Sequence, residues 1–344
     1  MMKGIHGGDI YRNQVNIDFS VNTNPMGIPD NVKKALYKAI EKCNEYPDIE
    51  ASKLIQDVSG ALNIKKEYLL FGNGASEIFM GIVHGLRPKK VMIPVPSFFG
   101  YEYATKAVTS DIVYFQLNEE DEFSLKDNFI ETLSNDIELI FLANPNNPTG
   151  KMTDKQYFVK IMDACKEKNI MVVLDECFIE FCENETSMLS EIERYENLIL
   201  VRAFTKIYAI PGVRLGYLIC SNQNILKKIK RQLPEWNLST FAQEAGTACI
   251  HNTDYVKKTV EYIKKERTYL SCGLKKMGIR VYDSKTDFIL IFTEYQLYEY
   301  LLKKGILIRN CDNFKGLSKG FYRIAVKTRE ENEKLLKEIG ECIG

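Results

Sequence analysis

The sequence has 344 residues, and its 46 lysine and arginine residues balance 46 aspartate and glutamate residues, so the formal net charge is zero. A balanced charge argues against nucleic acid or an anionic membrane as the main partner, and any anion site must then be a local cluster of arginines. The length suggests about two domains with a large core, and no apolar run approaches the roughly 18 residues that cross a membrane.

The chain opens on a segment that is too short to form a domain, His6–Asp9, and continues to a turn cluster at 22–25. The first residues lack the apolar centre of a signal peptide, which favours a cytoplasmic protein. The range 29–43 predicts a helix, because apolar residues recur on one helical face, at Val32, Leu36, Ile40 and Cys43. The pair Tyr46-Pro47 ends it.

Strands and helices then alternate. Short apolar runs predict buried strands at 69–71, 91–94, 112–117, 139–143, 170–174 and 197–200. Helical patterns occupy 78–86, 154–168, 223–231 and 239–250. This alternation predicts an α/β fold with a mostly parallel, doubly wound sheet. A long helix at 253–277, strands at 288–292, 306–308 and 321–326, and a closing helix at 330–343 predict a smaller α+β C-terminal domain.

Lys206 follows the last of the six strands and is predicted to lie on a turn, with Arg214 eight residues further on. A lysine at this place reaches the carboxyl edge of a parallel sheet, where α/β proteins bind their ligands. A buried lysine beside cations loses its proton more easily, and a neutral amine forms a Schiff base with an aldehyde. A solvated loop lysine is the alternative, since most lysines are exposed.

Two further polar motifs stand directly after apolar strands. They are Asn144-Pro145-Asn146-Asn147-Pro148-Thr149-Gly150 and Leu174-Asp175-Glu176. A carboxylate at a strand end is often a turn or helix cap, but it also suits an ion pair with a protonated ring nitrogen. The glycine-rich turn 72–77 precedes a helix, whose bare N–H groups would bind an anion.

Together with Thr205-Lys206 and Arg214, these motifs resemble the fold-type I pyridoxal-phosphate (PLP) enzymes of the class I/II aminotransferase family. The resemblance covers the chain from His6 to the last helix. It implies a large PLP-binding domain at about 31–250 and a small C-terminal domain at 251–344. Residues 1–30 would line the active site, and the long helix at 253–277 would link the two domains.

The resemblance also implies a role for individual residues. Lys206 would carry PLP as a Schiff base, Asp175 would pair with the pyridine nitrogen, and Asn147 would bond the 3′-oxygen. The remaining cofactor-binding positions are Gly74, Ala75, Ser76, Phe98, Phe178, Thr205 and Arg214, with Tyr46 entering from the partner subunit of a homodimer. For Phe98 the alternative is a place in the core, and for Tyr46 it is a packed loop.

Two positions depart from the family pattern. Phe178 stands where the family often has a tyrosine that donates to the 3′-oxygen, and a phenylalanine cannot donate. Ala203 stands where a serine or threonine often binds the phosphate, and Thr205 would partly substitute. We therefore expect the properties of the cofactor bound to Lys206 to differ from those in family members that have the usual tyrosine and serine or threonine.

Arg323 matches the family's α-carboxylate clamp, because a planar guanidinium binds a carboxylate through two hydrogen bonds. Arg309 lies fourteen residues earlier. Two arginines suit an amino acid that carries a second anion, such as a phosphate, although Arg309 alone also fits a surface ion pair. His6 and Asn22 would complete the substrate site, and a frayed terminus is the alternative for His6.

Within the family, His6-Gly7-Gly8, Phe178 and the block from Arg309 to Leu317 look most like L-threonine-O-3-phosphate decarboxylases, which make aminopropanol phosphate for cobalamin. Histidinol-phosphate aminotransferases share every PLP motif and are the alternative. A non-catalytic PLP-fold binding protein is a third alternative, and the presence of Lys206 argues against it.

The nine cysteines are scattered and form no C-x-x-C pair, and histidine occurs three times. This pattern favours reduced thiols and no metal site. The expected partner is a small phosphorylated amino acid or amine.

Overall fold

A computed structural model describes residues 6–183 and 187–344. Its centre is a seven-stranded sheet, and the spatial order of the strands is β2 (Leu69–Gly72), β8 (Gly216–Ile219), β7 (Leu198–Ala203), β6 (Met171–Asp175), β5 (Leu139–Ala143), β3 (Lys90–Val95) and β4 (Asp111–Gln116). Only β8 runs antiparallel to its neighbours. The sheet is therefore mostly parallel, as the alternation of strands and helices predicts.

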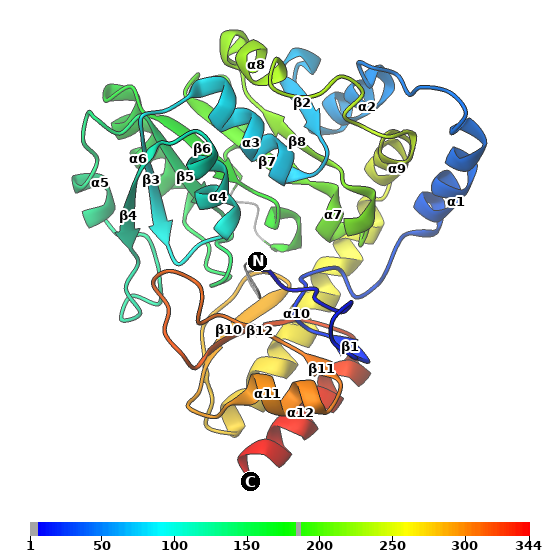
Figure 1. Ribbon diagram of the computed structural model, residues 1–344, viewed down its shortest axis with the longest axis vertical. Helices are drawn as coiled ribbons and strands as arrows, with labels where there is room; N and C mark the ends of the chain where they lie inside the picture. The colour runs from blue at the N-terminus through cyan, green and yellow to red at the C-terminus, as the bar shows by residue number, and fades with distance from the viewer. Residues whose placement is uncertain (1–5, 184–186) are drawn as a thin grey trace.

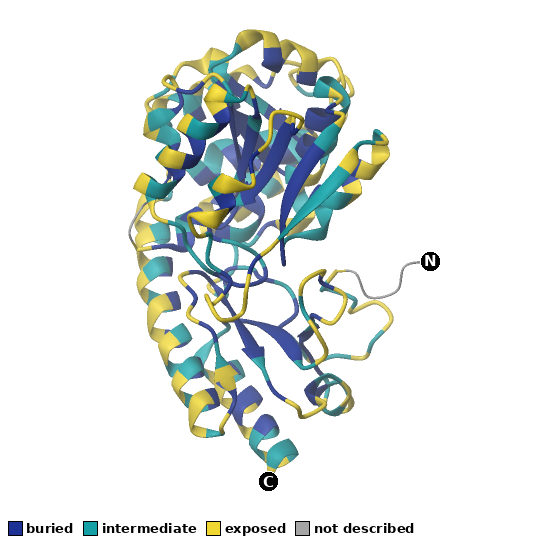
Figure 2. Ribbon diagram, turned by 90° about the vertical axis from the view of Figure 1, so that its left-hand side faces the viewer, coloured by how far each residue is buried: buried dark blue, intermediate teal, exposed yellow. Residues whose placement is uncertain are grey.

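Helices cover both faces of this sheet (Figure 1). The helices of this part of the chain are α1 (Asp30–Ala39), α2 (Ser52–Leu62), α3 (Ala75–Leu86), α4 (Phe99–Ala107), α5 (Asn128–Glu131), α6 (Lys155–Glu167), α7 (Phe204–Ile207), α8 (Gln223–Lys230) and α9 (Thr240–Ile250), and α1, α2 and α8 pack on other helices. Because helices bury the central strands on both sides, those strands are largely apolar, with Arg202 and Asp175 as polar residues near the ends of β7 and β6. Figure 2 shows the buried residues concentrated in the strands and the exposed ones on the outer helix faces.

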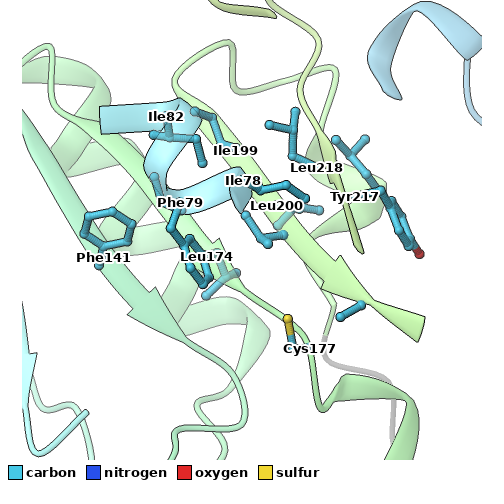
Figure 3. Close-up of a cluster of buried hydrophobic side chains, with 14 of the residues drawn as sticks. Ile78, Phe79, Ile82, Phe141, Leu174, Cys177, Ile199, Leu200, Tyr217 and Leu218 are labelled. Carbon is cyan, nitrogen blue, oxygen red and sulfur yellow. The ribbon is translucent and has the colours of Figure 1, made fainter. Parts of the chain in front are cut away.

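Helix α3 shows how the core is built (Figure 3). Ile78, Phe79 and Ile82 recur on one helical face and are almost completely buried. They pack over Leu174 and the other strand residues of the sheet drawn in the figure. Burying such side chains stabilises the fold by about 1.5–3 kcal/mol each. This packing fixes the N-terminus of α3 at the carboxyl edge of the sheet.

The C-terminal part contains a four-stranded antiparallel sheet in the order β12 (Arg309–Asn310), β13 (Phe321–Ala325), β10 (Phe288–Phe292) and β9 (Arg280–Val281). Helices α10 (Thr253–Lys276), α11 (Leu297–Lys303) and α12 (Arg329–Ile343) accompany it. A two-stranded parallel sheet joins β1 (Ile17–Asp18) to β11 (Ile306–Leu307). The N-terminal segment is thus tied to the C-terminal part, and α10 runs from the large sheet down to the small one (Figure 1).

The predicted elements are confirmed, and the majority of their ends are shifted by no more than two residues. The predicted helix at 29–43 differs most from the structure. Its α-helical part stops at Ala39 and a 3-10 turn follows. Ile40 is 60% exposed and Cys43 is also exposed, so the predicted apolar face is buried only in part. The prediction that Lys206 lies on a simple turn is wrong, because the residue sits in the one-turn helix α7.

No helix in the described part of the chain is long and apolar enough to cross a membrane. All nine cysteines are free, and six of them are buried.

Candidate active site

The carboxyl edge of the large sheet gathers the residues singled out in the sequence. Strands β5, β6 and β7 are adjacent and parallel, and Asp175, the last residue of β6, lies in register with Ala143 of β5 and Val201 of β7. The segments that follow β5 and β7 carry Asn147 and Lys206. Parallel strands end at one edge, so three motifs that are distant in sequence meet there.

Lys206 is held by the N-terminal segment. The backbone N–H of Asn24 donates to the Lys206 carbonyl oxygen at 3.1 Å, and the Asn24 side-chain amide donates to the carbonyl of Ile207 at 2.8 Å. Burial lowers the pKa of Lys206; the charge of Asp287 opposes that shift and Arg323 adds to it. The amine of Lys206 therefore loses its proton more easily than that of an exposed lysine. Sequence reasoning missed Asn24, although it lies in the turn cluster that contains Asn22.

Asp175 is a fixed hydrogen-bond acceptor. The phenol of Tyr101 donates to one carboxylate oxygen at 2.6 Å, and the N–H of Cys177 donates to the other at 2.9 Å. Burial raises the pKa of Asp175, and these two hydrogen bonds oppose the shift. No sequence pattern singles out Tyr101, which is 1% exposed and stacks on Phe141 in the core. A cation beside Asp175 would keep this carboxylate ionised.

Gly74 and Arg214 meet at the N-terminus of α3. Gly74 has φ = 78° and ψ = 166°, a backbone conformation that residues other than glycine rarely adopt. A Cβ atom at Gly74 would lie 2.4 Å from Nη2 of Arg214. Helix N–H groups and an arginine thus form a cradle of the size and charge that bind a phosphate. Ser76 lies in the first turn of α3, and Thr205 is buried beside Lys206.

A cavity of about 540 Å³ opens beside this edge. Of the predicted residues, its lining includes His6, Phe98, Asn147, Arg309 and Arg323. The centre of the His6 ring lies 5.9 Å from that of Phe98. Partial burial and the nearby arginines lower the pKa of His6. The residue is exposed, and its role in the site stays a prediction.

Arg309 and Arg323 are direct cross-strand partners in β12 and β13. Their side chains are 6% and 7% exposed. Arg323 donates to the Asn147 side chain and, at 2.8 Å, to the carbonyl of Ser20, while its buried Nε–H has no partner among the described residues. Burial and the charge of Arg309 lower the pKa of Arg323 to about 10. Two positive charges on directly opposite residues repel each other and destabilise a sheet. An anion bound between the two guanidinium groups would relieve this repulsion.

Three further predicted residues do not line this cavity. Phe178 is buried, and its ring packs edge-to-face on Phe288 at 5.1 Å. Asn22 is 3% exposed, and its Oδ1 atom has no hydrogen-bond partner among the described residues. Tyr46 is 82% exposed and contacts the ring of Trp236. A single chain thus leaves Tyr46 on the surface.

Comparisons with known proteins agree with this arrangement. The sequence profile described as Aminotransferase class I and II matches residues 14–339. The chain is 33% identical to the threonine-phosphate decarboxylase of Salmonella typhimurium, over 93% of this chain and 89% of that one. It is 36% identical to the histidinol-phosphate aminotransferase of Clostridium kluyveri, over 87% and 85% of the two chains.

Two solved structures have the same fold. The histidinol-phosphate aminotransferase from Clostridium acetobutylicum aligns with a TM-score of 0.90 at 34% identity, covering 95% of this chain and 99% of that one. The L-threonine-O-3-phosphate decarboxylase from Porphyromonas gingivalis aligns with a TM-score of 0.84 at 23% identity, covering 94% and 98%. The latter identity supports the fold alone.

The chain belongs to the class I and II aminotransferase family and has the fold-type I architecture of PLP-dependent enzymes. Its cofactor is pyridoxal 5′-phosphate. The residues present fit this group. The cradle at Gly74 and Arg214 suits the phosphate, the oriented Asp175 suits the ring nitrogen, and Lys206 has the lowered pKa that an amine needs to attack an aldehyde.

Proposed function

We propose that this protein decarboxylates L-threonine O-3-phosphate to aminopropanol phosphate, a step of cobalamin biosynthesis, with PLP joined to Lys206. The supporting observation is the buried pair of arginines in register on β12 and β13. The proposed substrate carries a carboxylate and a phosphate, so each guanidinium has one anion to bind. Histidinol phosphate carries a phosphate but no carboxylate.

The cofactor-binding residues act in two groups. Gly74, Ala75, Ser76, Thr205 and Arg214 would bind the phosphate through N–H groups, hydroxyls and the guanidinium. Asp175 would keep the ring nitrogen protonated, Asn147 would bond the 3′-oxygen, Phe98 would stack on the ring and Phe178 would pack nearby without a hydrogen bond. PLP with a protonated ring nitrogen accepts the electrons of a bond broken at the substrate Cα.

The substrate-binding residues determine which bond breaks. We propose that Arg323 and Asn22 would bind the substrate carboxylate, while Arg309 and His6, which line the cavity, would bind the substrate phosphate. The free Nε–H of Arg323 and the unpartnered Oδ1 of Asn22 are the polar atoms available for this.

Histidinol-phosphate aminotransferase is the second candidate, because a solved enzyme of that name matches at 34% identity over nearly the whole chain. An aminotransferase must regain its amino group from a second amino acid, whose carboxylates would also fit two arginines. The observation that favours the decarboxylase is that its substrate carries two anionic groups, a carboxylate and a phosphate, for the two buried arginines.

One assay separates the candidates. Purified protein with PLP is given L-threonine phosphate, and carbon dioxide is measured with and without a 2-oxo acid. The proposed function predicts release that does not depend on the oxo acid. Turnover of histidinol phosphate only with 2-oxoglutarate would instead support the aminotransferase. No turnover of either compound, with no PLP fixed on Lys206 by borohydride, would favour the non-catalytic alternative.

A further inference from the structure

Tyr101 contacts two of the residues expected to bind the cofactor ring, and the proposed function gives it no role. It lies in the first turn of α4, where its N–H donates to the carbonyl of Phe98 at 3.3 Å. Its hydroxyl donates to Oδ2 of Asp175 at 2.6 Å. Its ring meets that of Phe98 edge to face, with 5.6 Å between the ring centres and 82° between the ring planes. One side chain on α4 therefore supports both Phe98 and the carboxylate at the end of β6.

The core holds the ring of Tyr101 in place. The ring is stacked on that of Phe141, with 5.0 Å between the ring centres and 6° between the planes. The ring of Phe79 meets it at a right angle, with 5.1 Å between the centres. Phe79 and Phe141 belong to the core drawn in Figure 3. Because these contacts leave the buried ring little room to turn, the hydroxyl has a fixed direction, toward Asp175.

The hydroxyl acts on Asp175 as a donor. Burial and the charge of Asp175 raise the pKa of Tyr101, so the phenol keeps its proton at neutral pH. A donated hydrogen bond stabilises the ionised form of a carboxyl group. The backbone N–H of Cys177 makes the other such bond, to Oδ1 at 2.9 Å. The bond from Tyr101 is the one that a change of side chain removes.

We propose that Tyr101 is a positioning residue whose hydroxyl keeps Asp175 oriented and ionised, as the acceptor for the protonated ring nitrogen of PLP. The proposal rests on the role that the proposed function gives to Asp175. Tyr101 acts through this carboxylate and touches no substrate. Without the hydroxyl, the carboxyl of Asp175 becomes more basic and draws the proton away from the ring nitrogen. The ring then accepts electrons less well.

The test compares wild-type holoenzyme with Tyr101→Phe, which keeps the ring and its contacts and removes only the hydroxyl. NMR of PLP labelled with ¹⁵N in its ring reports whether that nitrogen carries a proton. The signal of Tyr101→Phe should move toward the unprotonated position. kcat should fall at least about tenfold, as for the loss of a hydrogen bond to a charged group. KM should change far less, because Tyr101 does not line the substrate cavity. A ring-nitrogen signal at the wild-type position overturns the proposal.

The matched control is Tyr195→Phe. Tyr195 is also buried, and its hydroxyl also donates to an aspartate at 2.6 Å, Asp163 on the outer helix α6. It precedes β7, so it lies at the amino edge of the sheet, opposite the site. The ring-nitrogen signal and kcat of this variant should match wild type. If Tyr101→Phe fails to fold while Tyr195→Phe folds, the role of Tyr101 is structural and the proposal is wrong.

A double variant tests whether the hydroxyl acts through Asp175. Asp175→Asn removes the charge, so adding Tyr101→Phe to it should change kcat by less than about twofold. A further tenfold loss in the double variant would contradict the proposal. If Asp175→Asn alone leaves the ring-nitrogen signal and kcat at their wild-type values, the role given to Asp175 by the proposed function fails. That result differs from an unmoved signal in Tyr101→Phe alone.

Discussion

At the scale of single residues, the site depends on charges whose burial is only partly compensated. Arg309 and Arg323 face each other almost completely buried, and Arg323 keeps one unpartnered N–H. Burial lowers the pKa of both. A bound carboxylate or phosphate would give the unpartnered Nε–H of Arg323 an acceptor and would place a negative charge beside two buried guanidinium groups.

Arg309→Ala should therefore impair use of the phosphorylated substrate. A hydrogen bond to a charged group contributes about 1.5–3 kcal/mol, so kcat/KM should fall at least about tenfold. PLP absorbance should stay unchanged, because Arg309 is expected to touch the substrate and not the cofactor. Arg280→Ala is the control, as Arg280 is an exposed arginine paired with Glu119. An Arg309→Ala enzyme with wild-type kcat/KM would remove Arg309 from the substrate site.

At the scale of secondary-structure elements, helix ends and strand ends determine the geometry of the cofactor site. The N-terminus of α3 needs a glycine, because Gly74 combines a glycine-only backbone conformation with close approach of Arg214. At the ends of β6 and β7, a buried network ties Glu176 to Arg202 and Ser187. These contacts hold the segments that carry Asp175 and Lys206 next to each other.

Gly74→Ala should weaken PLP binding at least about tenfold, because a Cβ would force the guanidinium of Arg214 away and strain the backbone by roughly 1–3 kcal/mol. Gly27→Ala is the matched control. Gly27 also has a positive φ, of 77°, but no atom lies within 4 Å of the place where its Cβ would be. Fluorescence titration of apoprotein with PLP measures both. Equal PLP affinities for the two variants would contradict the assignment of Gly74 and Arg214 to the phosphate-binding site.

Arg202→Met should lower the free energy of unfolding by about 3–5 kcal/mol, because it leaves the ionised Glu176 buried without its cation. The Nε and Nη2 atoms of Arg202 donate to Glu176 at 3.0 and 2.9 Å, and the two side chains are 4% and 0% exposed. Urea unfolding measures the loss. Lys230→Met, which breaks the exposed pair with Glu50, should change little. A loss no larger than that control would show that the pair is not needed.

At the scale of the whole molecule, apolar periodicity in the sequence predicts nearly all of the large sheet, because its strands are buried on both faces. Strand-end position predicts that Asn147, Asp175 and Lys206 come together. Periodicity could not predict Tyr101, since a core tyrosine looks the same whether or not its hydroxyl binds Asp175. Periodicity also could not predict that Arg309 lies opposite Arg323, because β12 has only two residues and is too short to show an alternating pattern. The division into domains at 31–250 and 251–344 stays a prediction.

The exposed surface of the chain points to a dimer. Tyr37, Ile40, Tyr46 and Ile49 are large apolar residues in one stretch, and each is at least 46% exposed. Large apolar residues that are left exposed are a feature of interaction surfaces. We therefore propose a twofold homodimer in which Tyr46 enters the partner's PLP site, and most soluble oligomers have this symmetry.

Mixing two inactive variants tests this exchange directly. Lys206→Ala removes the lysine from its own site, and Tyr46→Ala removes the tyrosine from the partner's site. In a mixed dimer one site combines the intact Lys206 of one chain with the intact Tyr46 of the other. Refolding the variants together at equal amounts should give half mixed dimers with one working site each, hence about a quarter of wild-type activity. If Tyr46 served its own chain, no mixed dimer would contain an intact site, and activity would stay at the level of the separate variants.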